Sequence, residues 1–465
     1  MSNILRKATS IPVNKDIYAQ YNLKENPFPL NPFISQENPD KRYNGDIYEA
    51  SVRDLENTKV EENFLKKPQS DPNHIRVGYI LDTSYVGRGN GKSSFALNLI
   101  KKINNSFCLD ISKDINKCFG LYIVPEPSGK TKTFSNLLDK WADSIFNSTV
   151  KIIDYSLASL RLEVILNLYP EIFSEEDLSN EQELILKVNS VEWYNNNKIS
   201  YDSIYKVLLE NEFYNKINSN NPLRKRYSHT FEHHNFKIIS TKHLNEYYLG
   251  LKKESEKIDF IFNDLVNLFL AAGFNGAYVI VDDFERIPDF QSDRQKRDFA
   301  FEIRTNFFDG SSANSRYGFF NLILMLHAGV PRLIEKAWSE SGMEQRSSIA
   351  SSVNAPHIVH FNKLDKNRAI LLIKKYLTEF RLKDEDSISP FTEAAIEKIG
   401  ETKEYNAAQM LSLAYMLLED CAMKGISKID VPEVNLMLQK SQIEVETADN
   451  IIDENSTDLM SKASE

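Results

Sequence analysis

Residues 77–94 read VGYILDTSYVGRGNGKSS, and this stretch decides the fold. Residues 77–81 are almost entirely apolar, which predicts a buried strand. The glycines at positions 87, 89 and 91 allow a tight turn, and apolar residues then recur at helical spacing through residues 95–103. The stretch therefore predicts a strand, a glycine-rich loop and a helix in direct succession.

Further apolar runs along the chain predict more strands of the same kind. They are residues 120–124, 277–281, 322–326 and 357–361, with helical patterns between them. Continuous apolar strands that alternate with helices are typical of a parallel sheet that is covered on both faces. The sequence thus predicts an α/β fold with a parallel five-stranded sheet.

The remaining segments differ in composition, and they predict the domain organisation. Prolines exclude a regular helix from Asn26–Phe33, so we expect the Phe and Leu side chains there to pack onto a neighbouring domain. From residue 364 the pattern is helical only. The predicted parts are a Pro/Asn-rich lead-in (1–70), a core in two pieces (71–150 and 256–363), a largely helical insertion (151–255), a small all-helical domain (364–440) and an acidic disordered tail (441–465).

The charge of the chain is concentrated near its C-terminal end. The 465 residues carry a net charge of −10, of which residues 441–465 contribute −6, so residues 1–440 carry only −4. The overall acidity argues against a protein that coats nucleic acid through bulk charge. No run of about 18 apolar residues, no signal-peptide pattern and only 3 cysteines are present, so we expect a cytoplasmic protein without a membrane span or a disulfide framework.

The glycine-rich loop has the residues of a phosphate-binding loop. Backbone N–H groups of such a loop surround phosphate oxygens, and the following helix N-terminus favours negative charge. Lys92 is expected to reach the β- and γ-phosphates of a nucleotide and Ser93 to hold Mg²⁺, although Val86 replaces the usual first glycine. The predicted nucleotide-binding residues are Gly87, Arg88, Gly89, Asn90, Gly91, Lys92, Ser93 and Ser94.

The strand at residues 277–281 runs into acidic residues that would complete such a site. Asp282 at the end of the strand would bind Mg²⁺ through water. Asp283 would orient or deprotonate the attacking water, and Glu285 is a second candidate for that role.

These motifs together resemble the AAA+ ATPases of the additional-strand P-loop class. The resemblance covers about residues 50–440 without the insertion, and the most similar groups are origin-recognition initiators, ExeA and transposition-type ATPases, and the ATPases of BREX-type phage defence. It depends on Asn26-Pro27-Phe28, on Asp282-Asp283-Phe284-Glu285-Arg286, and on residues 364–434, which resemble the helical lid of these proteins.

The resemblance also implies roles for residues outside the loop. His327 ends the fourth strand, where the family has a polar residue that senses the γ-phosphate; a plain hydrogen bond to backbone is the alternative. Arg346, with Arg332 as the second choice, would complete the site of a neighbouring subunit. Asn406-Ala407-Ala408-Gln409 stands where the lid normally offers an arginine, so we expect the coupling of the lid to nucleotide to be weak.

The resemblance implies a Mg²⁺-dependent ATPase that couples nucleotide state to a change of shape in a homo-oligomer. Its partner would be DNA or a DNA-bound protein, in antiviral defence against phage, in transposition or in replication. The alternative is a slow-turnover nucleotide switch in signalling or scaffolding, because Asp283 replaces the usual Glu and the lid arginine is missing.

Four other patterns are weaker. Asn362–Asp365 matches a guanine-reading motif, but no glycine follows the Asp282 strand at the required spacing, and Asp365 is better explained as a helix cap. His229–His233 matches a zinc-peptidase pattern without a third ligand. Ser128–Thr131 is interpreted as a surface turn, and the basic residues within 224–242 as solvated or as a DNA contact.

Overall fold

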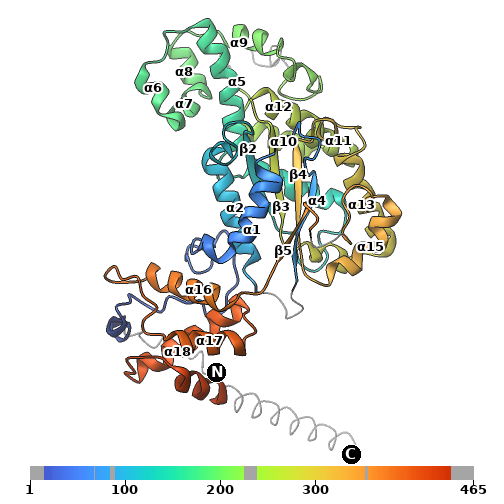
Figure 1. Ribbon diagram of the computed structural model, residues 1–465. Coiled ribbons are helices and arrows are strands. Elements are labelled where there is room, and N and C mark those ends of the chain that lie inside the picture. Colours follow the sequence, from blue (N-terminus) through green and yellow to red (C-terminus); the bar gives the residue numbers. More distant parts are fainter. Residues whose placement is uncertain (1–14, 68, 84–88, 225–237, 351–353, 441–465) are drawn as a thin grey trace, which may run out of the picture. The chain divides into compact units, whose positions relative to one another are not determined.

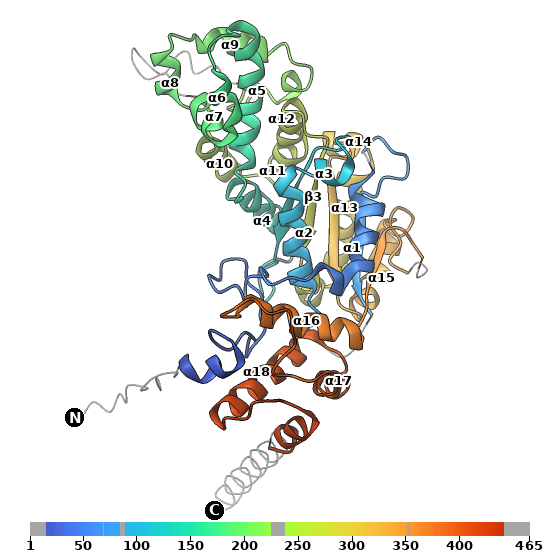
Figure 2. The same ribbon diagram turned by 60° about the vertical axis from the view of Figure 1, so that its left-hand side comes forward.

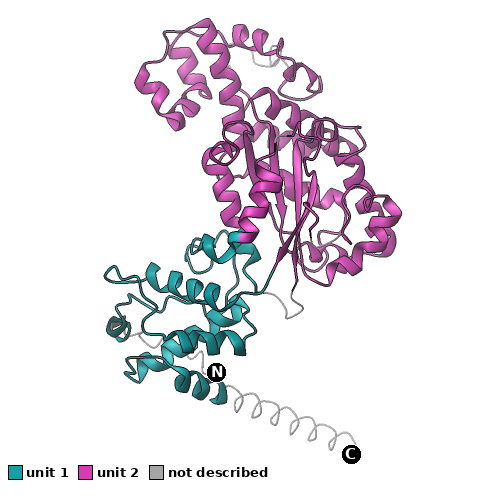
Figure 3. Ribbon diagram, in the orientation of Figure 1, with its two compact units in different colours: residues 1–54, 86–95, 362–465 teal, residues 55–85, 96–361 magenta. Residues whose placement is uncertain are grey.

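The computed structural model describes residues 15–67, 69–83, 89–224, 238–350 and 354–440. The chain forms two compact units, each with its own hydrophobic core (Figure 3). Unit 1 consists of residues 1–54, 86–95 and 362–465, and unit 2 of residues 55–85 and 96–361. Among the described residues no helix is long and apolar enough to cross a membrane.

Unit 2 contains a five-stranded sheet in which every pair of neighbouring strands is parallel (Figure 1). The order is β2-β3-β4-β1-β5. The register places Ile80 of β1 opposite Met325 of β4 and Val359 of β5. The predicted α/β fold and its five strands are confirmed, as β1 (Val77–Asp82), β2 (Cys118–Ile123), β3 (Gly276–Val281), β4 (Phe320–Leu326) and β5 (Ile358–Phe361).

Alternate residues of the strands face opposite sides of the sheet, and helices cover both sides (Figure 2). On one side Trp141 of α4 packs edge-on against Phe320 of β4, with ring centroids 5.2 Å apart. On the other side Gly78 and Gly120 leave room for Phe64 and Ile100: a Cβ at either glycine would meet these side chains at 2.5 Å and 2.7 Å. The parallel arrangement brings the carboxyl ends of all five strands to one edge of the sheet.

The helices of unit 2 outside the insertion surround this sheet. They are α1 (Asp54–Val60, whose first residue belongs to unit 1), the π-helical turn η3 (Glu61–Leu65), α2 (Lys92–Ser106, which begins in unit 1), α3 (Leu109–Ser112), α4 (Phe134–Phe146), α11 (Glu254–Asp259), η5 (Phe260–Leu265), α12 (Val266–Ala271), η6 (Phe284–Arg286), η7 (Pro288–Phe290), α13 (Asp293–Phe307), α14 (Ala313–Tyr317) and α15 (Val330–Ser341).

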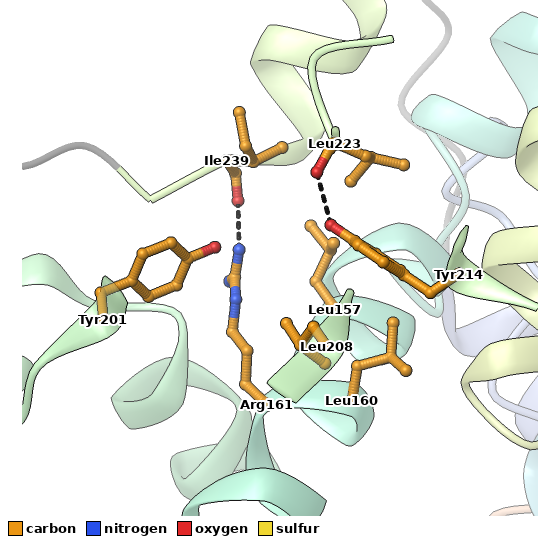
Figure 4. A pocket seen from close by; sticks show the side chains of 8 residues that line it. All are labelled: Leu157, Leu160, Arg161, Tyr201, Leu208, Tyr214, Leu223 and Ile239. Atoms are coloured by element: carbon orange, nitrogen blue, oxygen red, sulfur yellow. Dashed lines mark hydrogen bonds between the residues drawn. The ribbon is translucent and has the colours of Figure 1, made fainter. Parts of the chain in front are cut away.

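The insertion is helical where it is described, and it shares the apolar core of unit 2. Its buried Arg161 donates to the Asn189 side chain at 2.7 Å and to the Ile239 carbonyl at 2.9 Å, beside a cavity of about 10 Å³ (Figure 4). That volume is about the size of one water molecule, so the cavity is a packing defect and not a ligand site. The helices are α5 (Ile152–Leu168), α6 (Glu175–Ser179), α7 (Glu181–Val188), α8 (Val191–Asn196), α9 (Tyr201–Leu208), η4 (Tyr214–Lys216) and α10 (Thr241–Gly250).

Unit 1 joins an N-terminal segment to C-terminal helices. Phe28 is fully buried, and its ring centroid lies 6.0 Å from that of Tyr376 on α16 (Lys366–Glu379). The expectation that the Phe and Leu side chains of this segment pack onto a neighbouring domain is therefore confirmed for Phe28, which packs onto the C-terminal helical part. It is wrong for Leu30 and Phe33, which are 40% and 68% exposed. The elements are η1 (Lys15–Tyr21), η2 (Ala50–Arg53), α16 (Lys366–Glu379), α17 (Glu393–Thr402), α18 (Ala407–Met423) and a helical stretch at residues 431–440.

Candidate functional site

The acidic residues that follow β3 lie at the carboxyl edge of the sheet. Asp282 is 3% exposed, and both of its carboxylate oxygens accept hydrogen bonds. The Tyr122 hydroxyl donates to Oδ2 at 2.6 Å, and the backbone N–H of Asp283 donates to Oδ1 at 2.8 Å. These two donors fix the orientation of the carboxylate while each oxygen keeps a further lone pair for a cation or its water.

Asp283 is turned toward a different partner. Its backbone lies in the left-handed region, with φ of 47°, and its carboxylate forms an ion pair with Arg286 on the following turn η6. Arg286 also donates to the carbonyl of Pro125, at 3.1 Å. The sequence reasoning missed both Tyr122 and Arg286. A tyrosine near the end of an otherwise apolar strand and an arginine three residues after Asp283 are the signals that could have identified them.

Glu285 and His327 form the second part of the acidic edge. Glu285 is 5% exposed, and its Oε1 lies 2.9 Å from Nε2 of His327, which directly follows β4. The His327 ring therefore meets a carboxylate. One ligand atom each from Asp283, Glu285 and His327 lies within 4.8 Å of the others. The expected acidic and histidine residues are thus brought together by the ends of β3 and β4.

The glycine-rich loop is described from Gly89 onward, so Gly87 and Arg88 lie outside the described residues. Gly89 and Gly91 have φ of +119° and +86°, a region that side chains other than glycine rarely adopt. Helix α2 begins at Lys92, which is 8% exposed, and Ser93 and Ser94 occupy its first turn. The N–H of Phe95 donates to the Gly91 carbonyl at 3.0 Å, as the first helical bond.

The loop carbonyls of unit 1 have donors from two distant segments. The N–H of Ala408 donates to the Gly89 carbonyl at 2.8 Å, and Nη2 of Arg53 donates to the Asn90 carbonyl at 2.7 Å. The loop thus contacts α18 directly, although no arginine is present at the expected lid position. Arg53 follows no motif or periodic pattern, so sequence reasoning had no signal for it.

The two candidate arginines for a neighbouring site, Arg346 and Arg332, are both exposed. Arg346 is close enough to Arg76 that its charge, added to the larger effect of burial, lowers the pKa of Arg76. Arg76 immediately precedes β1, so Arg346 lies toward the amino edge of the sheet. Arg332 is on α15. The structure therefore does not bring Arg346 to Asp282 and Glu285 of the same chain.

The weaker sequence patterns have structural explanations where they are described. Asp365 accepts a hydrogen bond from the N–H of Arg368 at 2.9 Å and caps α16, as expected. Residues 127–130 form a turn, as expected for Ser128–Lys130, whereas Thr131 is buried and accepts a hydrogen bond from the N–H of Glu126 at 3.0 Å. The zinc-peptidase pattern at 229–233 and most of the basic segment lie outside the described residues. Arg224 donates to the carbonyl of Asn215.

No known protein family has a sequence model that matches this chain, and no curated protein is significantly similar to it. The function must therefore be argued from the residues and their geometry.

Proposed function

We propose that this protein binds and hydrolyses ATP in the presence of Mg²⁺. The observation that carries the proposal is the arrangement of the sheet. The strand β1 leads into the loop of Gly89–Ser93, and the ends of β3 and β4 supply Asp282, Glu285 and His327 at the same edge. The order also supports the resemblance to additional-strand P-loop ATPases, because β4 separates the strand that leads to the loop from the strand that ends in acids.

The available donors fit a magnesium ion and a triphosphate. The Asp282 carboxylate is an oxygen ligand of the kind that Mg²⁺ prefers, and Tyr122 holds it in place. The Ser93 hydroxyl is a ligand of the same kind. Lys92 would pair with the β- and γ-phosphates at the start of α2. Mg²⁺, when bound, would supply positive charge that stabilises the phosphate oxygens.

The attacking water needs a hydrogen-bond acceptor, and Glu285 is the better candidate. Asp283 already forms an ion pair with Arg286, which occupies its carboxylate. Glu285 is buried beside His327, so its carboxylate is oriented by the imidazole. We therefore assign water orientation to Glu285, in preference to Asp283, and the support of that carboxylate to His327.

A slow nucleotide switch is the second candidate function. The observation that favours it is that both acids have partners: Asp283 pairs with Arg286, and Glu285 contacts His327. Turnover would then wait for a rearrangement that releases Glu285 toward water. In either case we propose, from the resemblance alone, action as a homo-oligomer on DNA or a DNA-bound partner, with Arg346 serving the adjacent subunit.

The experiment compares ATP turnover and ATP affinity of the wild type with Lys92→Ala and Asp282→Ala. The ATPase proposal expects turnover in the wild type that both substitutions abolish, with ATP affinity lost mainly in Lys92→Ala. Tight ATP binding with negligible turnover in the wild type would favour the switch. Equal turnover in wild type and Lys92→Ala would contradict both.

A further inference from the structure

The carbonyl groups of the glycine-rich loop need hydrogen-bond donors from outside the loop. When the N–H groups of a loop point toward an anion, its carbonyl groups point outward and need donors elsewhere. Two successive carbonyls, those of Gly89 and Asn90, receive donors from residues remote in sequence. The shape of the loop therefore depends on groups outside the motif.

Arg53 is the side chain that supplies a donor to the Asn90 carbonyl. It is 3% exposed, and its guanidinium spans two backbone carbonyls: Nη2 donates to Asn90 at 2.7 Å and Nη1 donates to Asn362 at 2.6 Å. Asn362 follows β5 directly, so one planar group connects the loop with the start of the C-terminal segment. A lysine ammonium is a single point of charge and cannot span two carbonyls in this fork geometry.

The position of Arg53 is itself fixed by packing. Val52, the preceding residue of η2, is buried in a small apolar cluster with Leu364 and Ala407. The next residue, Asp54, pairs with Arg368 of α16 at 3.0 Å. Ala407 opens α18, whose Ala408 N–H holds the Gly89 carbonyl. The N-terminal segment and the C-terminal helices therefore support the same two loop residues.

We propose that Arg53 is a positioning residue of the nucleotide site, which holds the loop in its phosphate-binding shape through the Asn90 carbonyl. The inference rests on the proposed function, because the loop is assigned to ATP there. It explains how the N-terminal segment and α18 are coupled to the loop without a lid arginine. Movement of either segment changes the donors of the loop carbonyls and thereby the affinity for phosphate.

Arg381 provides a matched control within the same unit. It is also buried, at 6% exposed, and its guanidinium likewise caps backbone carbonyls, those of Tyr21, Ser387 and Ser389. None of these carbonyls belongs to the loop. Arg53→Ala and Arg381→Ala thus remove the same kind of interaction, and only the first removes it from the loop.

The test measures ATP and ADP affinity by calorimetry, and the melting temperature without nucleotide, on the full chain. We expect Arg53→Ala to bind ATP at least 10-fold more weakly, Arg53→Lys to be intermediate, and Arg381→Ala to melt earlier but to bind ATP within twofold of the wild type. Equal ATP affinity of Arg53→Ala and the wild type would overturn the inference. So would a loss of affinity in Arg381→Ala as large as that in Arg53→Ala.

A second measurement needs no ATP, and it tests the inference even if Arg53→Ala does not fold. Amide hydrogen exchange at residues 89–92 is compared between the wild type and Arg53→Lys. Exchange at least 10-fold faster in Arg53→Lys supports the inference, and unchanged exchange overturns it. Failure of the proposed function is recognised separately, as the absence of ATP binding in the wild type or equal ATP binding in Lys92→Ala.

Discussion

The carboxylate of Glu285 lies 2.9 Å from the imidazole of His327, and the two residues come from the ends of two neighbouring parallel strands. Neither residue could reach the other without the pairing of β3 with β4, because 41 positions separate them in the chain. The orientation of the Glu285 carboxylate therefore depends on the neighbouring strand and not on the acidic motif alone.

Glu285→Gln tests this assignment against Asp283→Asn. We expect Glu285→Gln to lower the ATP turnover rate by about 10²-fold or more with little change in ATP affinity, because a general base typically contributes that much. Asp283→Asn should lower turnover far less, since Asp283 already pairs with Arg286. Glu302→Gln, the same change on α13, serves as the control. A larger loss in Asp283→Asn than in Glu285→Gln would return the role to Asp283.

Tyr122→Phe removes the hydroxyl that donates to Oδ2 of Asp282. Loss of such an outer partner typically weakens metal binding by 10-fold or more, so we expect the Mg²⁺ concentration for half-maximal turnover to rise about 10-fold. Turnover at saturating Mg²⁺ should recover. The control is Tyr205→Phe, which removes a hydroxyl that donates to the Arg224 carbonyl in the insertion. This change should leave the Mg²⁺ dependence of turnover unchanged. An identical Mg²⁺ curve for Tyr122→Phe and the wild type would remove Tyr122 from the site.

Gly89→Ala adds a methyl group where the chain has no space. The new Cβ would lie 2.6 Å from the Ala408 Cβ and 2.7 Å from the Asn406 side chain, at a φ of +119°. We expect a loss of about 2–4 kcal/mol in the free energy of unfolding, from backbone strain plus overpacking, together with weaker ATP binding. Gly273→Ala, at a φ of +85° with open space around it, should cost only the strain, about 1–2 kcal/mol. Denaturant unfolding of both variants measures the difference.

Asp264 gives the stability of unit 2 a pH dependence. Burial raises its pKa from 3.8 to about 6, against hydrogen bonds from the Asn218 N–H at 2.6 Å and the Asn221 side chain at 2.9 Å. Between these two values the folded chain keeps a proton that the unfolded chain has released, so stability falls as pH rises from about 4 to 6 and is level on either side. The total loss in the free energy of unfolding from this group is about 3 kcal/mol. Chemical denaturation at pH 4 and pH 7 should show this loss in the wild type and not in Asp264→Asn.

The sequence predicted the elements better than it predicted their contacts. Apolar runs located every strand of the sheet, and local hydrogen-bonding chemistry located the cap at Asp365, because these signals lie within a few neighbouring residues. The acids after β3 were also evident. The partners of Asp283 and Glu285 were not, because they depend on φ at Asp283 and on which strand lies beside β3. The exposure of Phe33 likewise could not be read from its apolar side chain.

The hydrogen bond between Arg53 and the Asn90 carbonyl could not be predicted from the sequence. A hydrogen bond between a side chain and a backbone carbonyl leaves no periodic pattern in the sequence. From the sequence alone, every arginine in the N-terminal segment could make this contact. Only the three-dimensional arrangement of unit 1 distinguishes Arg53 from Arg42, which instead holds Asp40 and the Asn26 carbonyl.

Unit 1 is assembled from both ends of the chain, and this has a consequence for the order of events during synthesis. Domains generally fold as the chain emerges from the ribosome, N-terminal parts first. All five strands lie before residue 362, so the sheet can form while α18 has not yet been made. The N–H of Ala408, which donates to the Gly89 carbonyl, is made only after all five strands. A chain that ends before α18 would therefore carry all five strands of the sheet and a Gly89 carbonyl without its Ala408 donor.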